Sequence, residues 1–269
     1  MVTNDASYPL GIDISNNNGV IIWPRVAAAG VQFAICKASE GTGFVDRFMF
    51  GNVVGCRENG ILAGYYHFAR PSQNPARAEA DFFVETVARQ LNIDTGEVIA
   101  LDLEDEAASG DLSDWTLTWL QRVEELVGFK PLCYTSPGYA QAHGLANRPE
   151  IGQYGLWLAS WGVPTPPPPT PPWDLVAIHQ FAVGAAGTIP GVAGEIDLNH
   201  YNGPISTLPL YGKPAAEPPA DPPPLPPPPP LLTPAEVRAE LSRIVSQPDE
   251  VIVGRYLRAE IVALLERMP

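Results

Sequence analysis

The sequence predicts an α/β protein: a TIM-barrel-like (β/α) barrel with abbreviated late helices, followed by a proline-rich linker and a small C-terminal helical hairpin. Three observations predict this organisation. Short apolar segments alternate with helical patterns up to about residue 201, prolines are dense after that point, and helical apolar spacing then resumes. A chain of 269 residues has room for one large domain and an appendage. The expected boundaries are 1–203, 204–232 and 233–269.

The barrel is predicted from eight apolar segments of strand length. They are residues 9–15, 31–38, 61–68, 97–104, 131–136, 155–161, 175–181 and 195–199. Helical patterns separate the first six, at about 20–29, 46–59, 75–91, 113–127 and 137–144. This alternation is typical of parallel βα repetition, and eight strands favour a closed or nearly closed barrel. A doubly wound open sheet is the competitor, but no GxGxxG or GxxxxGK[ST] motif follows any segment.

Two proline tracts interrupt and end this region. The first, VPTPPPPTPPW at 163–173, lies between two predicted strands and is expected to be a rigid surface loop that narrows or extends one rim of a cleft. In the second, 14 of the 31 residues from Pro204 to Pro234 are proline. Such a segment forms a semi-rigid polyproline II spacer, with recognition by a PxxP-binding partner as the alternative.

The hairpin is predicted at residues 233–269. Thr233 is an N-cap, Pro234 occupies the first helical position and Glu236 completes a capping box. Apolar residues then recur at helical spacing: Val237, Leu241, Ile244 and Val245, followed by Val253, Leu257, Ile261, Leu264 and Met268. A module of this size is marginal alone. It therefore docks on the barrel, pairs with a second copy or binds a target.

Composition excludes several classes of partner. The net charge of −14 argues against nucleic acid, which requires clustered Lys and Arg. No apolar run of about 18 residues predicts membrane insertion, and the N-terminus lacks the pattern of a signal peptide. The cysteines, Cys36, Cys56 and Cys133, lie in apolar strand-like or helical segments and are expected to be buried small hydrophobes.

An acidic pair ends the fourth predicted strand. In GEVIALDLEDE, residues 96–106, Asp102 and Glu104 are two positions apart and face the same side of the strand. Glycosidic cleavage needs one protonated carboxyl and one ionised carboxylate, and neighbouring acids achieve this because each charge raises the pKa of the other. A salt-bridged pair or a metal site is the alternative. We predict Glu104 and Asp102 as catalytic residues.

Two further acids are expected at the same mouth. Catalytic groups of a barrel lie at the carboxyl ends of its strands. Asp13 ends the first predicted strand and Asp197 the last, and these strands are neighbours in a closed barrel. Each aspartate alone is more often a cap or loop residue. Together with Asp102 and Glu104 they predict four acids around one hollow.

Aromatic residues near the strand ends suit a sugar, whose apolar faces pack on rings. About half of them are expected to fill the core, and Tyr66, Tyr134 and Trp161 are the better candidates for a cleft. No HExxH motif, calcium loop or GxSxG elbow is present, so neither a metal nor a cofactor is expected. His67 and His179 are expected to be hydrogen-bonding residues rather than catalytic ones.

The sequence resembles glycoside hydrolase family 25 over about residues 8–203. The motifs that carry the resemblance occur in the family's order: GIDISNNNG, CKASEGTGFVDRFMFGNVVGCRENGILAGYYHFARP, LDLED, YTSPGY, LWLASWG, IHQF and GEIDLNHYNG. The resemblance implies a flattened, irregular β/α barrel and cleavage of the β-1,4 bond between N-acetylmuramic acid and N-acetylglucosamine in peptidoglycan. By motif, Glu104 resembles the acid/base, Asp102 its partner, and Asp13 and Asp197 the further cleft aspartates.

The family resemblance leaves the mechanism and the setting open. Net retention is expected, and internal attack by the substrate's N-acetyl group is favoured over direct attack by Asp102. Asn18 stands where many relatives have Gln. The lack of a leader, the linker and the small module resemble a phage endolysin, held in the host cytoplasm until a holin releases it. The alternatives are an exported autolysin, a chitinase-like glycosidase, or a non-catalytic wall-binding or virion protein.

Overall fold

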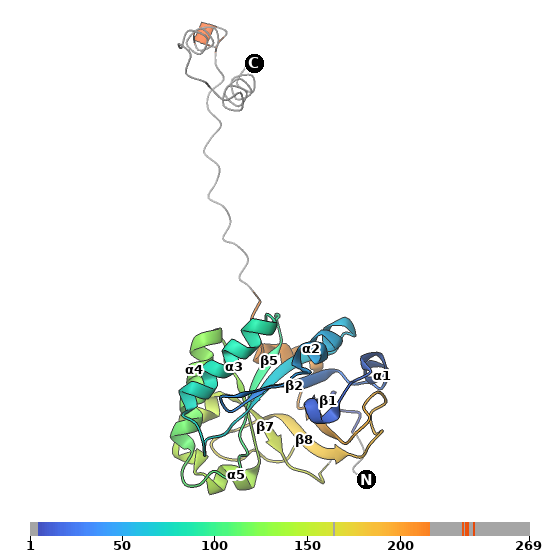
Figure 1. Cartoon of the computed structure of the whole chain (residues 1–269), viewed down its shortest axis with the longest axis vertical. Coiled ribbons are helices and arrows are strands. Elements are labelled where there is room, and N and C mark those ends of the chain that lie inside the picture. The colour runs from blue at the N-terminus through green and yellow to red at the C-terminus, as the bar shows by residue number, and fades with distance from the viewer. Residues whose placement is uncertain (1–4, 164, 216–232, 234, 237–238, 240–269) are drawn as a thin grey trace. The chain divides into compact units, whose positions relative to one another are not determined.

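The computed structural model describes residues 5–163 and 165–215, together with 233, 235, 236 and 239 (Figure 1). The first two ranges form one compact domain. Near the start of the predicted hairpin, Thr233 and Glu236 form the expected capping box: Thr233 N and Oγ1 donate to Glu236 Oε2, and Glu236 N donates back to Thr233 Oγ1. The hairpin's apolar stripes and most of the proline-rich linker lie outside the described residues.

The domain is a closed barrel. Its strands are β1 (Leu10–Ile14), β2 (Phe33–Glu40), β3 (Phe44–Val45), β4 (Leu62–Phe68), β5 (Val98–Asp102), β6 (Leu132–Thr135), β7 (Gly155–Ala159), β8 (Val176–Gly184) and β9 (Ile196–Tyr201). The sheet order is β1-β9-β8-β7-β6-β5-β4-β2-β3, and β1 also pairs with β2, which closes the ring. All eight predicted strands are present, and the prediction of a closed barrel is confirmed. The short strand β3 pairs only with β2 and lies outside the ring.

The direction of the last strand differs from the prediction of parallel repetition. β9 is antiparallel to both of its neighbours, β8 and β1, whereas the other ring pairs are parallel. The reason lies in the connection, because residues 185–195 contain no crossover helix and a parallel return requires one. Asp197 is therefore near the start of β9 rather than at the carboxyl end of a parallel strand.

The predicted helices are present on the outside of the barrel. They are α1 (Trp23–Ala28), α2 (Met49–Glu58), α3 (Ala76–Gln90), α4 (Ser113–Val127) and α5 (Pro137–Ala142). Short 3-10 helices add η1 (Asn16–Asn18), η2 (Leu145–Asn147), η3 (Pro149–Gln153) and η4 (Ile205–Tyr211). α3 and α4 pack side by side on one flank (Figure 1). No helix of the described residues is long and apolar enough to span a membrane.

Two layers of side chains stabilise the fold. Strand residues that face outward pack against the helices, and inward residues, among them Phe33, Ile35 and Ile178, fill the barrel. Gly11 leaves room for this filling, because a Cβ there would lie 2.2 Å from the Phe33 ring. The three cysteines are buried and unpaired as disulfides, as the sequence predicts.

The proline content predicts that the domain ends at residue 203. In the structure the folded domain continues beyond this residue. Leu208 of η4 is fully buried in the interior cluster. The backbone of Lys213 exchanges hydrogen bonds with Gly96 and Glu97, before β5. η4 therefore closes the amino-terminal end of the barrel, and residues 204–215 belong to the domain rather than to the linker.

The first proline tract replaces a helix between β7 and β8. Its last residue, Trp173, is buried, and the Trp173 indole N–H donates to the Tyr154 carbonyl at 2.9 Å. A polyproline II segment covers about 3 Å per residue, so a short tract is sufficient to return the chain to the other end of the barrel. None of the described tract residues lines the cleft described below, so the expected effect on a cleft rim is not seen.

Candidate active site

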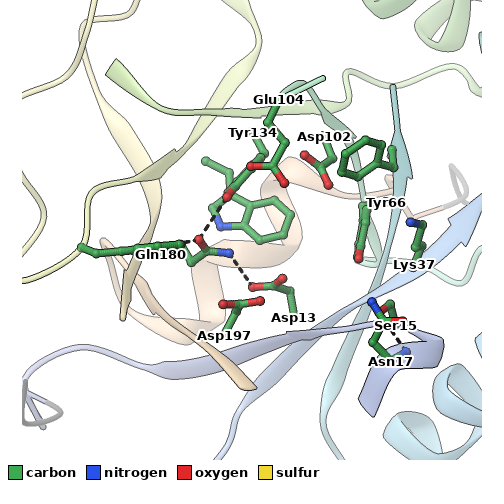
Figure 2. A pocket seen from close by; sticks show the side chains of 13 residues that line it. Asp13, Ser15, Asn17, Lys37, Tyr66, Asp102, Glu104, Tyr134, Gln180 and Asp197 are labelled. Atoms are coloured by element: carbon green, nitrogen blue, oxygen red, sulfur yellow. Dashed lines mark hydrogen bonds between the residues drawn. The ribbon is translucent and has the colours of Figure 1, made fainter. Parts of the chain in front are cut away.

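A pocket of about 300 Å³ opens at the carboxyl ends of the parallel strands. Its walls are formed by Asp13, Ser15, Asn17, Lys37, Tyr66, Phe68, Asp102, Glu104, Tyr134, Trp157, Trp161, Gln180 and Asp197. All seven site residues predicted from the sequence are among them. Figure 2 shows the four acids pointing into the same hollow from different parts of the chain.

The barrel's closure brings the four acids together. Asp13 in β1 and Asp197 in β9 are direct partners in the antiparallel register. Asp102 is the last residue of β5, and Glu104 follows it by two positions, where the chain leaves the strand. The predicted mouth therefore forms, although Asp197 reaches it from the start of an antiparallel strand.

Asp13 and Asp197 are held in different surroundings. Asp13 is buried, and its Oδ2 accepts hydrogen bonds from Gln180 Nε2 at 3.0 Å and Asn199 Nδ2 at 2.7 Å. Burial and the charge of Asp197 nevertheless raise the pKa of Asp13 well above its usual range. Burial, then the charge of Glu195, raises the pKa of Asp197 to about 6.

Asp102 and Glu104 also differ. Asp102 is buried, and within the described structure its Oδ1 has no hydrogen-bond partner. Burial, followed by the charges of Glu104 and Asp13, raises the pKa of Asp102 well above its usual range. Glu104 is more exposed; desolvation in the pocket raises its pKa, a hydrogen bond with Tyr134 lowers it, and the charge of Asp197 raises it again. The raised pKa values favour the protonated form of these carboxyls, which is the form that a general acid uses.

The salt-bridge alternative for the acids is excluded. Among the described residues no Lys, Arg or His forms an ion pair with any of the four. Lys37 lines the pocket, but its Nζ pairs with Glu40 at 2.6 Å and lies over the Phe68 ring, 4.7 Å from the centroid. The described residues also contain no group of three His, Cys, Asp or Glu arranged to hold a metal ion.

The sequence profile of glycosyl hydrolases family 25 matches residues 12–192. The chain belongs to this family. Lysozyme M1 of Streptomyces globisporus is 28% identical over 214 residues, covering 76% of this chain and 71% of that protein. The crystal structure of a bacterial lysozyme from Streptomyces coelicolor is similar with a TM-score of 0.64 and 28% identity, over 78% of this chain and 99% of that chain. The CTP1L endolysin has a TM-score of 0.64 and 31% identity, over 75% and 69% of the two chains.

Family 25 membership makes the protein a glycosyl hydrolase of the lysozyme type, an N-acetylmuramidase acting on peptidoglycan. The predicted family, irregular barrel and reaction class are confirmed. The match to the family profile includes three of the four pocket acids. The fourth, Asp197, lies five residues beyond the end of the match.

Aromatic rings form one wall of the family 25 pocket. Tyr66 and Tyr134 are buried, and both contact Trp157 edge to face, with centroids 6.3 Å and 4.7 Å away. Trp161 is 61% exposed at the rim. The rim position suits a ring that packs on a sugar face. Trp157 also lines the pocket, and its buried ring is part of the packed barrel interior.

Sequence reasoning missed six residues that line the pocket. They are Ser15, Asn17, Lys37, Phe68, Trp157 and Gln180. Gln180 had a visible signal, a polar residue within the apolar strand LVAIHQF. Lys37 had none, because its contacts with Glu40 and the Phe68 ring, which hold its ammonium group at the pocket, are seen only in the structure. The acids were visible because carboxylates at strand ends are unusual in an apolar sequence.

The Asn18 departure from the family pattern has a structural role. Asn18 Oδ1 accepts from Ser15 N, and Asn18 Nδ2 donates to the Glu195 carbonyl, both at 2.8 Å. The shorter amide thus ties η1 to the segment that leads into β9 and Asp197. Asn18 itself does not line the pocket, so the substitution leaves the four acids in place.

His67 and His179 are hydrogen-bonding residues of the fold, as expected. His67 is fully buried, with Nδ1 2.8 Å from Ser39 Oγ and Nε2 2.9 Å from Glu79 Oε2. His179 Nε2 is 2.8 Å from the Ser160 carbonyl. Neither lines the pocket.

Proposed function

We propose that Glu104 is the general acid/base of this muramidase and that Asp102 is its partner carboxylate. The bond cleaved is the β-1,4 linkage between N-acetylmuramic acid and N-acetylglucosamine. The observation that supports this assignment is four acids in one pocket, none of them paired with a cation from the part of the chain that the structure describes. Glu104 is the more exposed of the central pair, which suits the group that must reach the leaving oxygen.

The remaining predicted residues bind and orient the sugar. Asp13 and Asp197 accept hydrogen bonds from sugar hydroxyls and, by their charge, raise the pKa of the central pair. Tyr66, Tyr134 and Trp161 offer ring faces and polar tips to the substrate. Trp161, at the exposed rim, would contact a sugar further from the cleaved bond than the buried tyrosines do.

The orphaned oxygen of Asp102 favours substrate assistance. Its Oδ1 is buried at the pocket without a protein partner in the described structure. Leaving such an acceptor unsatisfied costs about 1–3 kcal/mol. The amide N–H of the substrate's N-acetyl group would satisfy it and would be oriented for internal attack on the anomeric carbon. Direct attack by Asp102 is the alternative, and a glycosyl-enzyme trapped on Asp102 would favour it.

The assignment is tested by turbidity loss of a peptidoglycan suspension. Wild type should clear the suspension, and Glu104→Gln should lose about 10³-fold or more of the rate, because the amide cannot donate an acidic proton. Glu58→Gln, at an exposed glutamate that ends α2 and lies outside the pocket lining, is the matched control and should retain activity. A fully active Glu104→Gln variant would remove the proposed role.

Product analysis identifies the bond. Mass spectrometry of the released fragments should find N-acetylmuramic acid at the reducing ends. N-acetylglucosamine at the reducing ends would instead indicate a glucosaminidase, and equal cleavage of chitin oligomers a chitinase-like enzyme.

We also propose that the enzyme is a phage endolysin, held in the host cytoplasm until a holin gives it access to the wall. Similarity to the CTP1L endolysin supports this setting. Residues 233–269 would then target the wall or pair two copies. Expression in a bacterial cytoplasm should leave cells intact until a holin is co-expressed, and lysis without one would contradict the proposal.

A further inference from the structure

Gln180, in β8, joins three pocket residues from different parts of the barrel. Its side chain is buried, and Oε1 accepts hydrogen bonds from the Tyr134 hydroxyl at 3.0 Å and from Trp161 Nε1 at 2.9 Å. Its Nε2 donates to Asp13 Oδ2 at 3.0 Å (Figure 2). An indole N–H only donates and a carboxylate only accepts, so these neighbours fix the orientation of the amide. Its carbonyl end faces Tyr134.

The Tyr134 hydroxyl has two partners and one proton. Besides Gln180, its neighbour in the pocket is Glu104, whose pKa the hydroxyl lowers (Figure 2). When Glu104 is protonated, its O–H can donate to the Tyr134 oxygen while the Tyr134 proton points to Gln180. When Glu104 is ionised, the Tyr134 proton turns to the carboxylate. The hydroxyl thus has a role in both states, provided that an acceptor exists at position 180.

We propose that Gln180 is a positioning residue that accepts the Tyr134 proton while Glu104 is protonated, so that Tyr134 partners Glu104 in both of its protonation states. The inference rests on the proposed acid/base role of Glu104. A general acid/base passes through both states in each catalytic cycle. Without the Gln180 carbonyl, the Tyr134 proton has Glu104 as its acceptor throughout, and the ionised carboxylate is favoured.

Titratable and charged groups from several elements interact electrostatically with Glu104. They are Asp13 of β1, Lys37 of β2, Asp102 of β5, Glu106, Tyr139 of α5 and Asp197 of β9. Replacing Gln180 with Met leaves all of them in the chain, but it removes a donor from Asp13 as well as the acceptor for Tyr134. The effect through Asp13 does not require the Tyr134 hydroxyl, so a Tyr134→Phe background separates the two.

The experiment measures the pKa of Glu104 by ¹³C NMR of glutamate carboxyls in the full chain, with the Glu104→Gln variant giving the assignment. Four proteins are compared: wild type, Gln180→Met, Tyr134→Phe and the double variant. Gln180→Met should lower the Glu104 pKa by about one unit, equivalent to ~1.4 kcal/mol. It should lower it much less when Tyr134→Phe is already present. The alkaline limb of the pH–activity profile should move to lower pH in Gln180→Met, because the acid loses its proton earlier.

Two results would overturn the inference. One is an equal shift with and without the Tyr134 hydroxyl, which would assign the whole effect to Asp13. The other is an unchanged Glu104 pKa in a Gln180→Met protein that circular dichroism shows to be folded. Neither result touches the acid/base role itself, which fails only if Glu104→Gln remains active. Thermal unfolding of each variant identifies any that does not fold, and Gln180→Leu then replaces Gln180→Met with the same expectation.

Discussion

At the scale of single residues, the pocket has one positive charge among its described lining, that of Lys37. This charge lowers the pKa of both Asp102 and Glu104, against the stronger effect of burial. Glu40 and the Phe68 ring hold the ammonium group near the acids without neutralising them. Lys37 therefore limits how far the acids' pKa values rise.

We expect Lys37→Met to raise the pKa of Glu104 and Asp102 by about one unit, since it removes an attractive charge from their ionised forms. Both limbs of the pH–activity profile should then move to higher pH. Lys130→Met is the matched control: Lys130 is exposed and lies over Tyr154, away from the pocket. A profile that does not move in Lys37→Met, or moves as much in Lys130→Met, would contradict this role.

Asp197 links function to stability. Its pKa of about 6 in the folded protein lies above the ordinary 3.8. Between these values the folded state binds a proton that the unfolded state lacks, so stability from this group is lost as pH rises through the window. Asp197→Asn, which does not titrate, should raise Tm at about pH 7 by roughly 2–4 °C and show no such gain near pH 4. The same gain at both values, measured by calorimetry, would assign the effect to packing instead.

Some pocket residues can be recognised in the sequence and others cannot. The acids and three aromatics could be predicted, because a carboxylate or ring at a strand end stands out from its apolar surroundings. Gln180 and Lys37 could not be ranked, because their importance lies in contacts between strands. The bond from Gln180 to Asp13 joins positions that become neighbours only after the barrel closes.

At the scale of elements, periodicity was sufficient for the eight barrel strands and five helices. It did not predict β3, which has two exposed residues, or the 3-10 helices, whose few residues carry no repeating pattern. It also did not give the direction of β9. Direction depends on the length and content of the loop before a strand, and an alternating apolar pattern reads the same in both directions.

η4 is the element whose role the proline content obscured. Leu208 is fully buried in the interior cluster, whereas Leu210, two residues later, is 83% exposed. We expect Leu208→Ala to reduce the free energy of unfolding by about 2–5 kcal/mol, because it opens a cavity in the barrel. Leu210→Ala should change it by about 0.5 kcal/mol or less. Urea unfolding of both variants checks the pair, and equal effects would show that η4 does not close the barrel.

At the scale of the whole molecule, the barrel places the site where distant segments meet. β1 pairs with β2 and β9, so the first and last strands of the barrel complete the pocket together. Hydrolysis is therefore a property of the entire domain up to residue 215, because the acids span β1 to β9 and η4 packs into the barrel interior.

This division leads to a prediction for a truncated enzyme. The cut belongs after residue 216, where the compact unit ends, and not after residue 203, since removing η4 would expose the barrel interior. The truncated protein keeps every pocket residue, so we expect its kcat on soluble glycan fragments to equal that of the full chain. On whole walls the proposed targeting role of residues 233–269 predicts a lower rate for the truncated protein, by about tenfold or more, because binding at a second place raises the local concentration of enzyme on the substrate. Light scattering on the full chain detects self-association. Equal rates for the two proteins on whole walls would exclude wall targeting, and a monomeric full chain would then exclude pairing as well.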